Sequence, residues 1–316
     1  MKKIGVTFTA LTEENLNKIK AIAPNYQVVQ LAHHDKEILD CEVIFGGIAT
    51  DLVKEARALK WIHTSFAGVD SLLAPHVKFP EDVILTNSAG TYGIAISEYL
   101  LTTTLMLMRR NLQYAKQQFE NTWQPLGAVK SIYGSKICVV GLGDIGENYA
   151  KRCKALGATV VGVVRTKRKT NPTSVDDLYT IDELEQAIKD ADVVALSLPG
   201  TPATTGLINA NILAKIKKGA LILNVGRGSA IDQDALIDAL TSGHIGGAGL
   251  DVTSPEPLPS DSPLWQIDNV IITPHISGNQ TLALTNQLIT DKFIKYLKDY
   301  IAGDPFEKVV DKQLGY

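Results

Sequence analysis

Three ionisable side chains in the second half of the chain could perform acid–base chemistry on a bound carboxylic acid. Each follows an apolar run that reads as a buried strand: Arg227, Glu256 and His275. In open α/β sheets, ligands bind outside the carboxyl ends of the parallel strands. The spacing therefore predicts that a guanidinium, a carboxylate and an imidazole converge at one edge of a sheet.

These three groups suit hydride-transfer chemistry on a 2-hydroxy or 2-keto acid. Arginine can bind a carboxylate through two parallel hydrogen bonds and polarise the adjacent carbonyl oxygen. Histidine can take the hydroxyl proton on oxidation and return it on reduction, because imidazole titrates near neutral pH. A carboxylate beside the imidazole would fix its tautomer and favour its protonated form. Taken singly, a surface arginine, a loop acid and a structural histidine are ordinary, so it is their common position that favours a catalytic set.

A glycine-rich turn precedes these residues and predicts a dinucleotide cofactor. Gly141, Gly143 and Gly146 follow an apolar strand and open a helical pattern. The first glycine permits the tight turn, the second lets the backbone approach a pyrophosphate, and the third allows close packing of helix on strand. The helix start, with Asp144 and Ile145, offers free N–H groups to phosphates. A plain strand–helix turn and a nucleoside-cofactor methyltransferase are the competing interpretations.

The segment after the next strand bears on the choice between NAD and NADP. An NAD enzyme normally places an acid there, on the ribose hydroxyls. Here the strand is followed by Arg165, Thr166, Lys167 and Arg168, and the first acid downstream is Asp176. Because arginine can bind a 2′-phosphate that an acid would repel, we predict cofactor contacts from Arg165 and Thr166 and favour NADP over NAD. The alternative is a solvated basic loop.

The overall composition argues against several classes of partner. The 316 residues carry a formal net charge of −3, which favours neither nucleic acid nor an anionic membrane surface. The most apolar stretch, Gly93–Met108, contains Glu98 and is shorter than the roughly 20 residues that a membrane span needs. Three scattered cysteines indicate neither disulfides nor a metal site and fit a reducing compartment, so we expect a cytoplasmic protein without a metal.

Short apolar runs alternate with helical patterns along nearly the whole chain, as is typical of parallel α/β sheets. The first third predicts a flavodoxin-like unit with strands at 3–8, 27–31, 43–45, 61–63 and 84–87 and helices at 13–22 and 51–58. One long helix is expected from 93 to about 119. A second series matches a doubly wound dinucleotide fold, with strands at 137–140, 159–164, 193–197, 221–225, 247–252 and 270–273. A last helix is expected at 281–301.

The order of these motifs resembles the D-2-hydroxyacid dehydrogenase family over nearly the whole chain. Further matching segments are Ser65–Asp70, Asn87–Gly90, Leu198–Thr205 and Leu250–Pro259. The resemblance implies an α/β protein of two doubly wound domains, with a Rossmann dinucleotide-binding domain (97–286) inserted in a flavodoxin-like substrate domain (1–96 and 287–316). It also implies hinges near Ile96 and Asn286, with the active site between the domains.

The same resemblance assigns roles to individual residues. Arg227, Glu256 and His275 match the family's catalytic arginine, glutamate and histidine. The backbone amides of Ala67 and Gly68, together with Arg227, would hold the substrate carboxylate.

Two further residues are expected at the cofactor. Asp251 would meet the nicotinamide carboxamide, and Pro199 would lie beside the dinucleotide. Within the family, the basic cluster after the second strand favours the glyoxylate/hydroxypyruvate reductases. Gly200 and Gly226 stand where the family often has a larger apolar residue and an alanine, so the substrate stays open within the class of small 2-hydroxy and 2-keto acids.

The apolar half of the helix after Gly93 predicts a homodimer. Apolar side chains cover more than one stripe of that helix, at Leu100, Leu101, Leu105, Met106 and Met108. A helix that is apolar on several sides is normally buried on several sides. A core helix buried wholly within its own chain is the alternative.

A function of another class stays open. A dinucleotide-sensing corepressor, or a binding protein without turnover, would keep the same fold. The intact set of arginine, glutamate and histidine argues against it, since a sensor needs no acid–base pair.

Overall fold

The chain folds into two compact units, each built around its own parallel sheet. The computed structural model describes residues 1–315. Unit 1 comprises Met1–Tyr92 and the segment from Gln280 onward, and unit 2 comprises Gly93–Asn279.

Helices occupy the two positions expected for hinges. Ile96 lies inside α2 (Gly93–Met108), and Asn286 lies inside α8 (Ala283–Ala302). The first amide of α2, at Gly93, donates to the carboxylate of Asp144 at 2.6 Å. This cap comes from a residue far along the chain, within the glycine-rich segment 141–146.

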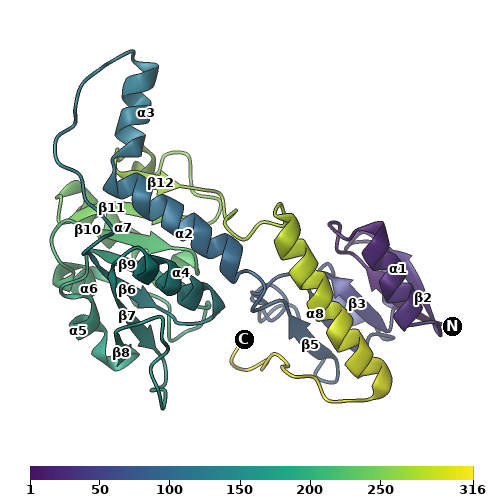
Figure 1. Ribbon diagram of the computed structural model, residues 1–316. Coiled ribbons are helices and arrows are strands. Elements are labelled where there is room, and N and C mark those ends of the chain that lie inside the picture. Colours follow the sequence, from purple (N-terminus) through teal and green to yellow (C-terminus); the bar gives the residue numbers. More distant parts are fainter. Residues whose placement is uncertain (316) are drawn as a thin grey trace. The chain divides into compact units, whose positions relative to one another are not determined.

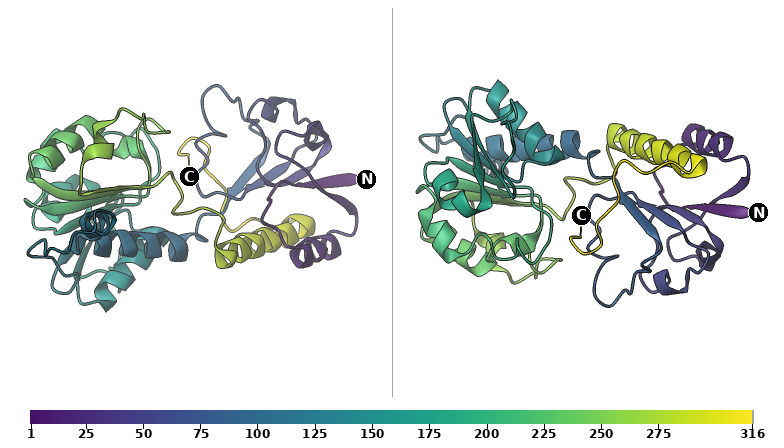
Figure 2. Two further views of the ribbon diagram at one scale, coloured as in Figure 1. Left: turned by 90° about the horizontal axis from the view of Figure 1, so that it is seen from above. Right: turned by 90° about the horizontal axis from the view of Figure 1, so that it is seen from below.

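Unit 1 has the strand order of flavodoxin-like folds, β2-β1-β3-β4-β5. Its central strands are buried along their whole length, as in parallel sheets covered on both faces. Helices α1 (Glu13–Ile22) and α8 pack side by side (Figure 2). The strands are β1 (Lys2–Val6), β2 (Tyr26–Gln30), β3 (Val43–Gly46), β4 (Trp61–Thr64) and β5 (Ile84–Asn87). The predicted flavodoxin-like sheet is thereby confirmed.

The helix predicted at 51–58 is wrong. Only short 3-10 helices form between the strands of this part of unit 1, η1 (Lys36–Asp40) and η2 (Val53–Glu55). Leu52, Val53 and Ala56 are all buried, so a single tight turn already places the apolar side chains of this segment in the core.

Unit 2 holds a seven-stranded parallel sheet in the order β12-β11-β10-β9-β6-β7-β8 (Figure 1). The order reverses beside β6, as in doubly wound dinucleotide folds, which confirms the predicted Rossmann fold. Its strands are β6 (Lys136–Val140), β7 (Thr159–Val164), β8 (Asp177–Thr180), β9 (Val193–Leu196), β10 (Ala220–Asn224), β11 (Ile245–Leu250) and β12 (Val270–Ile272). The helices that follow β6 in this unit are α4 (Asp144–Ala155), α5 (Leu184–Ile188), α6 (Ala210–Lys215) and α7 (Gln233–Thr241), with 3-10 helices η3 (Ile181–Glu183), η4 (Gly228–Ala230) and η5 (Pro263–Gln266).

One strand of this sheet was not predicted. β8 is a four-residue edge strand with no fully buried residue, so it lacks the apolar run that marks the other strands. It pairs with β7 only, from Val161 opposite Asp177 to Val164 opposite Thr180.

The long helix expected from 93 to 119 is two helices. α2 ends at Met108, Arg110 adopts a left-handed backbone with φ of +57°, and α3 (Asn111–Phe119) continues in a new direction. α3 and the loop to Leu126 stand out from the rest of unit 2 (Figure 1), and we call this segment the arm. Among the described helices, none has the length and apolarity that a membrane crossing requires.

Candidate active site

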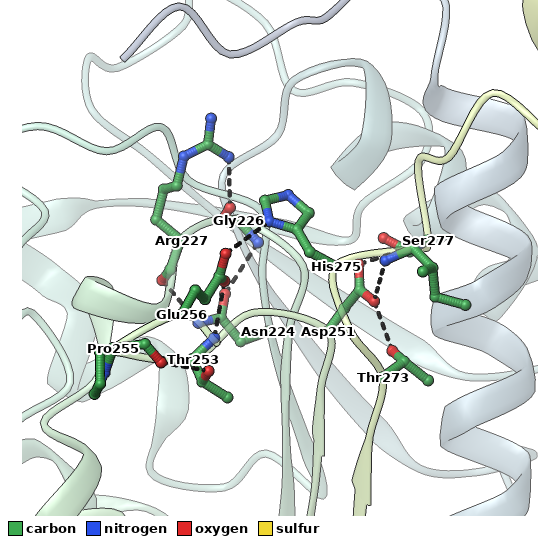
Figure 3. Close-up of polar contacts among 11 residues, drawn as sticks. Asn224, Gly226, Arg227, Asp251, Thr253, Pro255, Glu256, Thr273, His275 and Ser277 are labelled. Carbon is green, nitrogen blue, oxygen red and sulfur yellow. Dashed lines mark hydrogen bonds and ion pairs between the residues drawn. The ribbon is translucent and has the colours of Figure 1, made fainter. Parts of the chain in front are cut away.

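The three ionisable residues follow three adjacent strands of unit 2. Arg227 comes after β10, Glu256 after β11 and His275 after β12, and these strands are neighbours in the sheet. Because the strands are parallel, their carboxyl ends meet at one edge. Figure 3 shows the three side chains gathered there. The predicted convergence is what the structure has.

His275 and Glu256 form a hydrogen-bonded pair. Nδ1 of His275 lies 3.0 Å from Oε2 of Glu256, and the other carboxylate oxygen accepts the backbone N–H of Thr253 at 3.1 Å. About half of each side chain is exposed, 49% for the histidine and 40% for the glutamate. The loop of Glu256 therefore holds the carboxylate in place, and this carboxylate faces Nδ1 of His275.

The backbone under His275 is anchored by Asp251, which is buried. His275 has φ of +53° and donates its backbone N–H to the carbonyl of Asp251 at 2.8 Å. The Asp251 carboxylate accepts from the Thr273 hydroxyl at 2.6 Å and from the amides of Ile276 and Ser277 at 2.8 and 2.9 Å (Figure 3). The carboxylate of Asp251 therefore accepts several hydrogen bonds from the segment that carries the histidine. Its contact with a nicotinamide stays a prediction.

Arg227 is positioned by a buried asparagine. The side-chain amide of Asn224 donates to the carbonyl of Arg227 at 2.9 Å, while its oxygen accepts the N–H of Gly226 at 3.0 Å. Nη1 of Arg227 donates to the carbonyl of Gly226 at 2.8 Å. A Cβ at position 226 would lie 2.5 Å from the carbonyl oxygen of Leu198, which explains why this chain has glycine there.

The glycine-rich turn has the shape that a dinucleotide needs. Gly141 has φ of +99°, and a Cβ on Gly146 would lie 1.9 Å from the carbonyl oxygen of Gly141. A Cβ on Gly143 would meet no atom within 4 Å, so the backbone there faces open space. Gly143 also precedes α4, whose first amides point out of the helix end. These residues fit a bound pyrophosphate.

The side chain of Asp144 makes hydrogen bonds within unit 2. Its carboxylate accepts the amide of Gly93 and the side-chain amide of Asn148. Asp144 and Ile145 can therefore serve a phosphate through their backbone at the start of α4.

The basic loop after β7, which includes Arg165 and Thr166, is exposed, and the contacts of these two residues with a cofactor stay a prediction. Arg168 of this loop reaches the glycine-rich turn, where it donates to the carbonyl of Leu142. Pro199 lies in the loop after β9. The hydroxyl of Thr204, in the same loop, donates to the Pro199 carbonyl at 2.7 Å.

The predicted carboxylate-binding amides belong to unit 1, in the loop after β4. The carbonyl of Phe66 accepts from the Thr64 hydroxyl at 2.7 Å and from the Ser88 amide at 3.1 Å. The carbonyl of Ala67 accepts from the Asn87 side chain at 2.7 Å. Within residues 1–315, no hydrogen bond inside the chain uses the amides of Ala67 or Gly68. The loop thus binds its carbonyls inward and leaves these two donors for another group.

Two supporting residues of unit 2 were not anticipated. Asn224 is a polar residue that ends an apolar strand, and such a polar interruption is a usable signal. Tyr99 of α2 donates to Thr273, 2.6 Å away, which in turn donates to Asp251. Burial raises the pKa of Tyr99 above its usual value, so the hydroxyl stays a donor. No sequence pattern links Tyr99 to this strand.

The described part of the chain shows no group of side chains suited to a metal ion.

Comparisons with known proteins agree with this geometry. The model of the NAD-binding domain of D-isomer specific 2-hydroxyacid dehydrogenases matches residues 101–277. A crystal structure of a D-isomer specific 2-hydroxyacid dehydrogenase family protein from Aeromonas salmonicida is 31% identical, with a TM-score of 0.85 over 98% of this chain and 99% of that one.

Two named reductases are also similar. The NADPH-dependent glyoxylate/hydroxypyruvate reductase of Sinorhizobium meliloti, solved with NADP and sulfate, is 27% identical, with a TM-score of 0.84 and 100% of both chains covered. Human glyoxylate reductase/hydroxypyruvate reductase is 35% identical over 261 residues, which are 78% of this chain and 72% of the human protein. The chain therefore belongs to the D-isomer specific 2-hydroxyacid dehydrogenase family and is an NAD(P)-dependent oxidoreductase of 2-hydroxy acids.

Proposed function

We propose that this enzyme interconverts a small 2-keto acid of the glyoxylate or hydroxypyruvate kind and its 2-hydroxy acid, with NADP(H) preferred to NAD(H). The observation that supports this most directly is the His275–Glu256 hydrogen bond at the strand edge that also carries Arg227. The names of the S. meliloti and human relatives support the substrate class.

His275 is the proposed proton carrier. Because Nδ1 faces Glu256, Nε2 is the nitrogen that can face the substrate oxygen. In reduction, Nε2–H donates to the keto oxygen and passes its proton to it, and in oxidation Nε2 takes the hydroxyl proton. The nicotinamide, when bound, supplies or accepts the hydride at the C2 carbon of the substrate. Glu256 holds the ring in place and balances the charge of its protonated form.

The substrate carboxylate is assigned to Arg227 and to the amides of Ala67 and Gly68. A guanidinium can present two parallel N–H donors to a carboxylate, and two adjacent amides can bind one carboxylate oxygen. The inward hydrogen bonds of the Phe66 and Ala67 carbonyls support this role, since they fix the orientation of the loop.

The dinucleotide is assigned to the glycine-rich turn and its surroundings. Gly141, Gly143 and Gly146 with the backbone of Asp144 and Ile145 would hold the pyrophosphate. The other proposed contacts are Pro199, Asp251 and, at a ribose 2′-phosphate, Arg165 and Thr166. The basic character of the loop after β7 and the NADP bound to the S. meliloti relative support the preference for NADP.

We also propose that the enzyme works as a homodimer, with the arm at the interface. Leu100 and Met108 of α2 are buried inside unit 2, so that helix offers less free apolar surface than its sequence suggests. On the arm, however, Phe119 is 87% exposed and Trp123 fully exposed. Exposed large aromatic side chains are enriched at protein interfaces. A monomeric mass by light scattering at micromolar concentration would contradict the dimer.

The cytoplasm is the proposed location. Cys41, Cys138 and Cys153 are free and buried, which fits a compartment that keeps thiols reduced.

A substrate panel tests the proposed function. Purified enzyme is mixed with NADPH or NADH and with glyoxylate, hydroxypyruvate or a branched 2-keto acid, and cofactor consumption is followed by absorbance. We expect the fastest consumption with NADPH and one of the two small acids. Cofactor binding without consumption for any acid would instead indicate the sensor or corepressor. Faster turnover of the branched acid would place the enzyme elsewhere in the family.

A further inference from the structure

An arginine outside the expected cofactor set lies on the glycine-rich turn. Arg168 follows β7, and its Nη2 donates to the carbonyl of Leu142, between the first two glycines of the motif. Its Nη1 donates to Oε1 of Glu147 at 2.6 Å. Glu147 stands in the first turn of α4. One guanidinium therefore bridges the turn and the helix that would receive the dinucleotide.

We propose that Arg168 and Glu147 together determine the selectivity between NADPH and NADH. Arg168 binds the 2′-phosphate, and Glu147 is the internal counter-ion that this phosphate replaces. This inference depends on the proposed preference for NADP and adds the contact and the competitor that govern it.

The geometry favours Arg168 over its neighbour Lys169 for this role. Its contacts are made to the turn itself, whereas the neighbouring Lys169 is exposed and has no described hydrogen bond to that turn. The pair is partly shielded from water, since 37% of the arginine side chain and 30% of the glutamate side chain are exposed. A guanidinium in such a place keeps its charge and presents planar, paired donors, which suit phosphate oxygens.

Competition between two anions explains how the pair discriminates. Glu147 offers one negative charge to Arg168, whereas a phosphate monoester carries about −1.5 to −2 charges and three acceptor oxygens. The phosphate can therefore replace the carboxylate as the partner of Arg168. The uncharged 2′-hydroxyl of NADH cannot, so the arginine stays paired with Glu147 when NADH binds. Glu147 also lowers the affinity for the phosphate, because it competes for the same donors and repels the dianion.

Binding of cofactor fragments isolates this effect from catalysis. Calorimetric titration of the full chain with 2′,5′-ADP and with 5′-AMP compares ligands that differ only in the 2′-phosphate. The proteins are the wild type, Arg168→Gln, Glu147→Gln, the double variant, and Lys169→Gln as a control that removes one loop charge. Melting temperatures verify that each variant is folded.

The expected results are opposite for the two partners. Arg168→Gln weakens 2′,5′-ADP about ten- to a hundredfold, as for loss of a charge-assisted contact, and changes 5′-AMP less than about twofold. Glu147→Gln tightens 2′,5′-ADP by about two- to fivefold, the range for a partly exposed ion pair. In the Arg168→Gln background, Glu147→Gln has much less effect, because its partner is gone.

Other results overturn the proposal. These are equal losses for Arg168→Gln and Lys169→Gln, or no tightening by Glu147→Gln, or the same tightening in both backgrounds. The proposed function is tested separately by turnover. An enzyme that reduces 2-keto acids with NADPH but fails the fragment test loses only this inference, and an enzyme that passes the fragment test without turnover loses only the proposed reaction.

Discussion

Two histidines of this protein lie in opposite environments. His63 belongs to β4 in unit 1 and is completely buried, with its ring nitrogens 2.7 Å from the Thr86 hydroxyl and 3.3 Å from the Ser88 hydroxyl. His275 follows β12 in unit 2, has about half of its side chain exposed, and faces a carboxylate.

The difference shows what turns a histidine from a core residue into a proton carrier. Burial, with a smaller contribution from the nearby Lys292 ammonium, lowers the pKa of His63 to about 3, so this ring is neutral at physiological pH. It packs among aromatic rings, including Phe45 and Phe293. His275 instead has access to solvent and a carboxylate to receive one N–H, which leaves its second nitrogen for a substrate. A position near the end of a strand is therefore not enough to make a histidine a proton carrier.

Replacing His275 should produce the largest effect. In His275→Gln, kcat is expected to fall by about 10²–10⁴-fold, the usual contribution of a general acid–base group, while NADPH binding stays close to wild type. His244→Gln is the matched control, since His244 is a partly buried histidine of the same unit whose ring nitrogen lies 3.1 Å from the backbone carbonyl of Leu213. Near wild-type kcat in His275→Gln, measured by steady-state kinetics, would show that His275 is as passive in catalysis as His63.

Replacing Arg227 refines the comparison of the two histidines. It tests whether a polar group beside His275 binds the substrate or only stabilises the fold. Arg227→Lys should lower kcat/KM for the 2-keto acid about ten- to a hundredfold, since lysine cannot form the planar two-point contact. Melting temperature and kinetics are measured together. A structural arginine would give a lower Tm with unchanged kinetics.

His63 is expected to affect the pH dependence of folding stability rather than the catalytic rate. Its folded-state pKa of about 3 lies below the ordinary value of 6.5, so the unfolded chain binds the proton more tightly. This contribution is fully present above pH 6.5 and is lost as the pH falls toward 3. Between pH 7 and pH 5 the free energy of unfolding should lose about 2 kcal/mol through this residue.

Denaturant titrations at the two pH values, on wild type and His63→Gln, measure this loss. We expect the wild type to lose about 2 kcal/mol more than the variant. Equal losses would contradict the buried, neutral state. If the variant does not fold, the imidazole NMR signals of wild-type His63 give the same information, since they should not titrate between pH 7 and pH 5.

The smallest expected effect is that of Glu256→Gln. The pair with His275 is about half exposed, so the carboxylate should contribute about 1 kcal/mol or less, and reduction at neutral pH should slow by up to about fivefold. The amide keeps a hydrogen bond to Nδ1 but offers no charge to the protonated ring. A loss as large as that of His275→Gln would mean that the glutamate itself contacts the reacting atoms.

Much of the site could be predicted because its signals are local. The glycine-rich turn, Arg227 and His275 each follow an apolar strand, and parallel pairing brings such strand ends together. The left-handed Arg110 could not be foreseen, since no glycine or proline interrupts the pattern between 93 and 119. The contacts of Tyr99 with Thr273 and of Arg168 with Leu142 join segments far apart in sequence, and only packing determines them.

The contact between Gly93 and Asp144 has a consequence for protein engineering. A Cβ at position 93 would lie 2.2 Å from a carboxylate oxygen of Asp144, so any other residue there would push against the helix that starts at the cofactor turn. A chimaera that grafts unit 2 into another substrate unit should therefore be spliced before Gly93 and after Asn279, with the glycine retained. Splicing at 96 and 286 would instead join foreign sequence within the first turns of α2 and α8 and remove the residue that Asp144 caps.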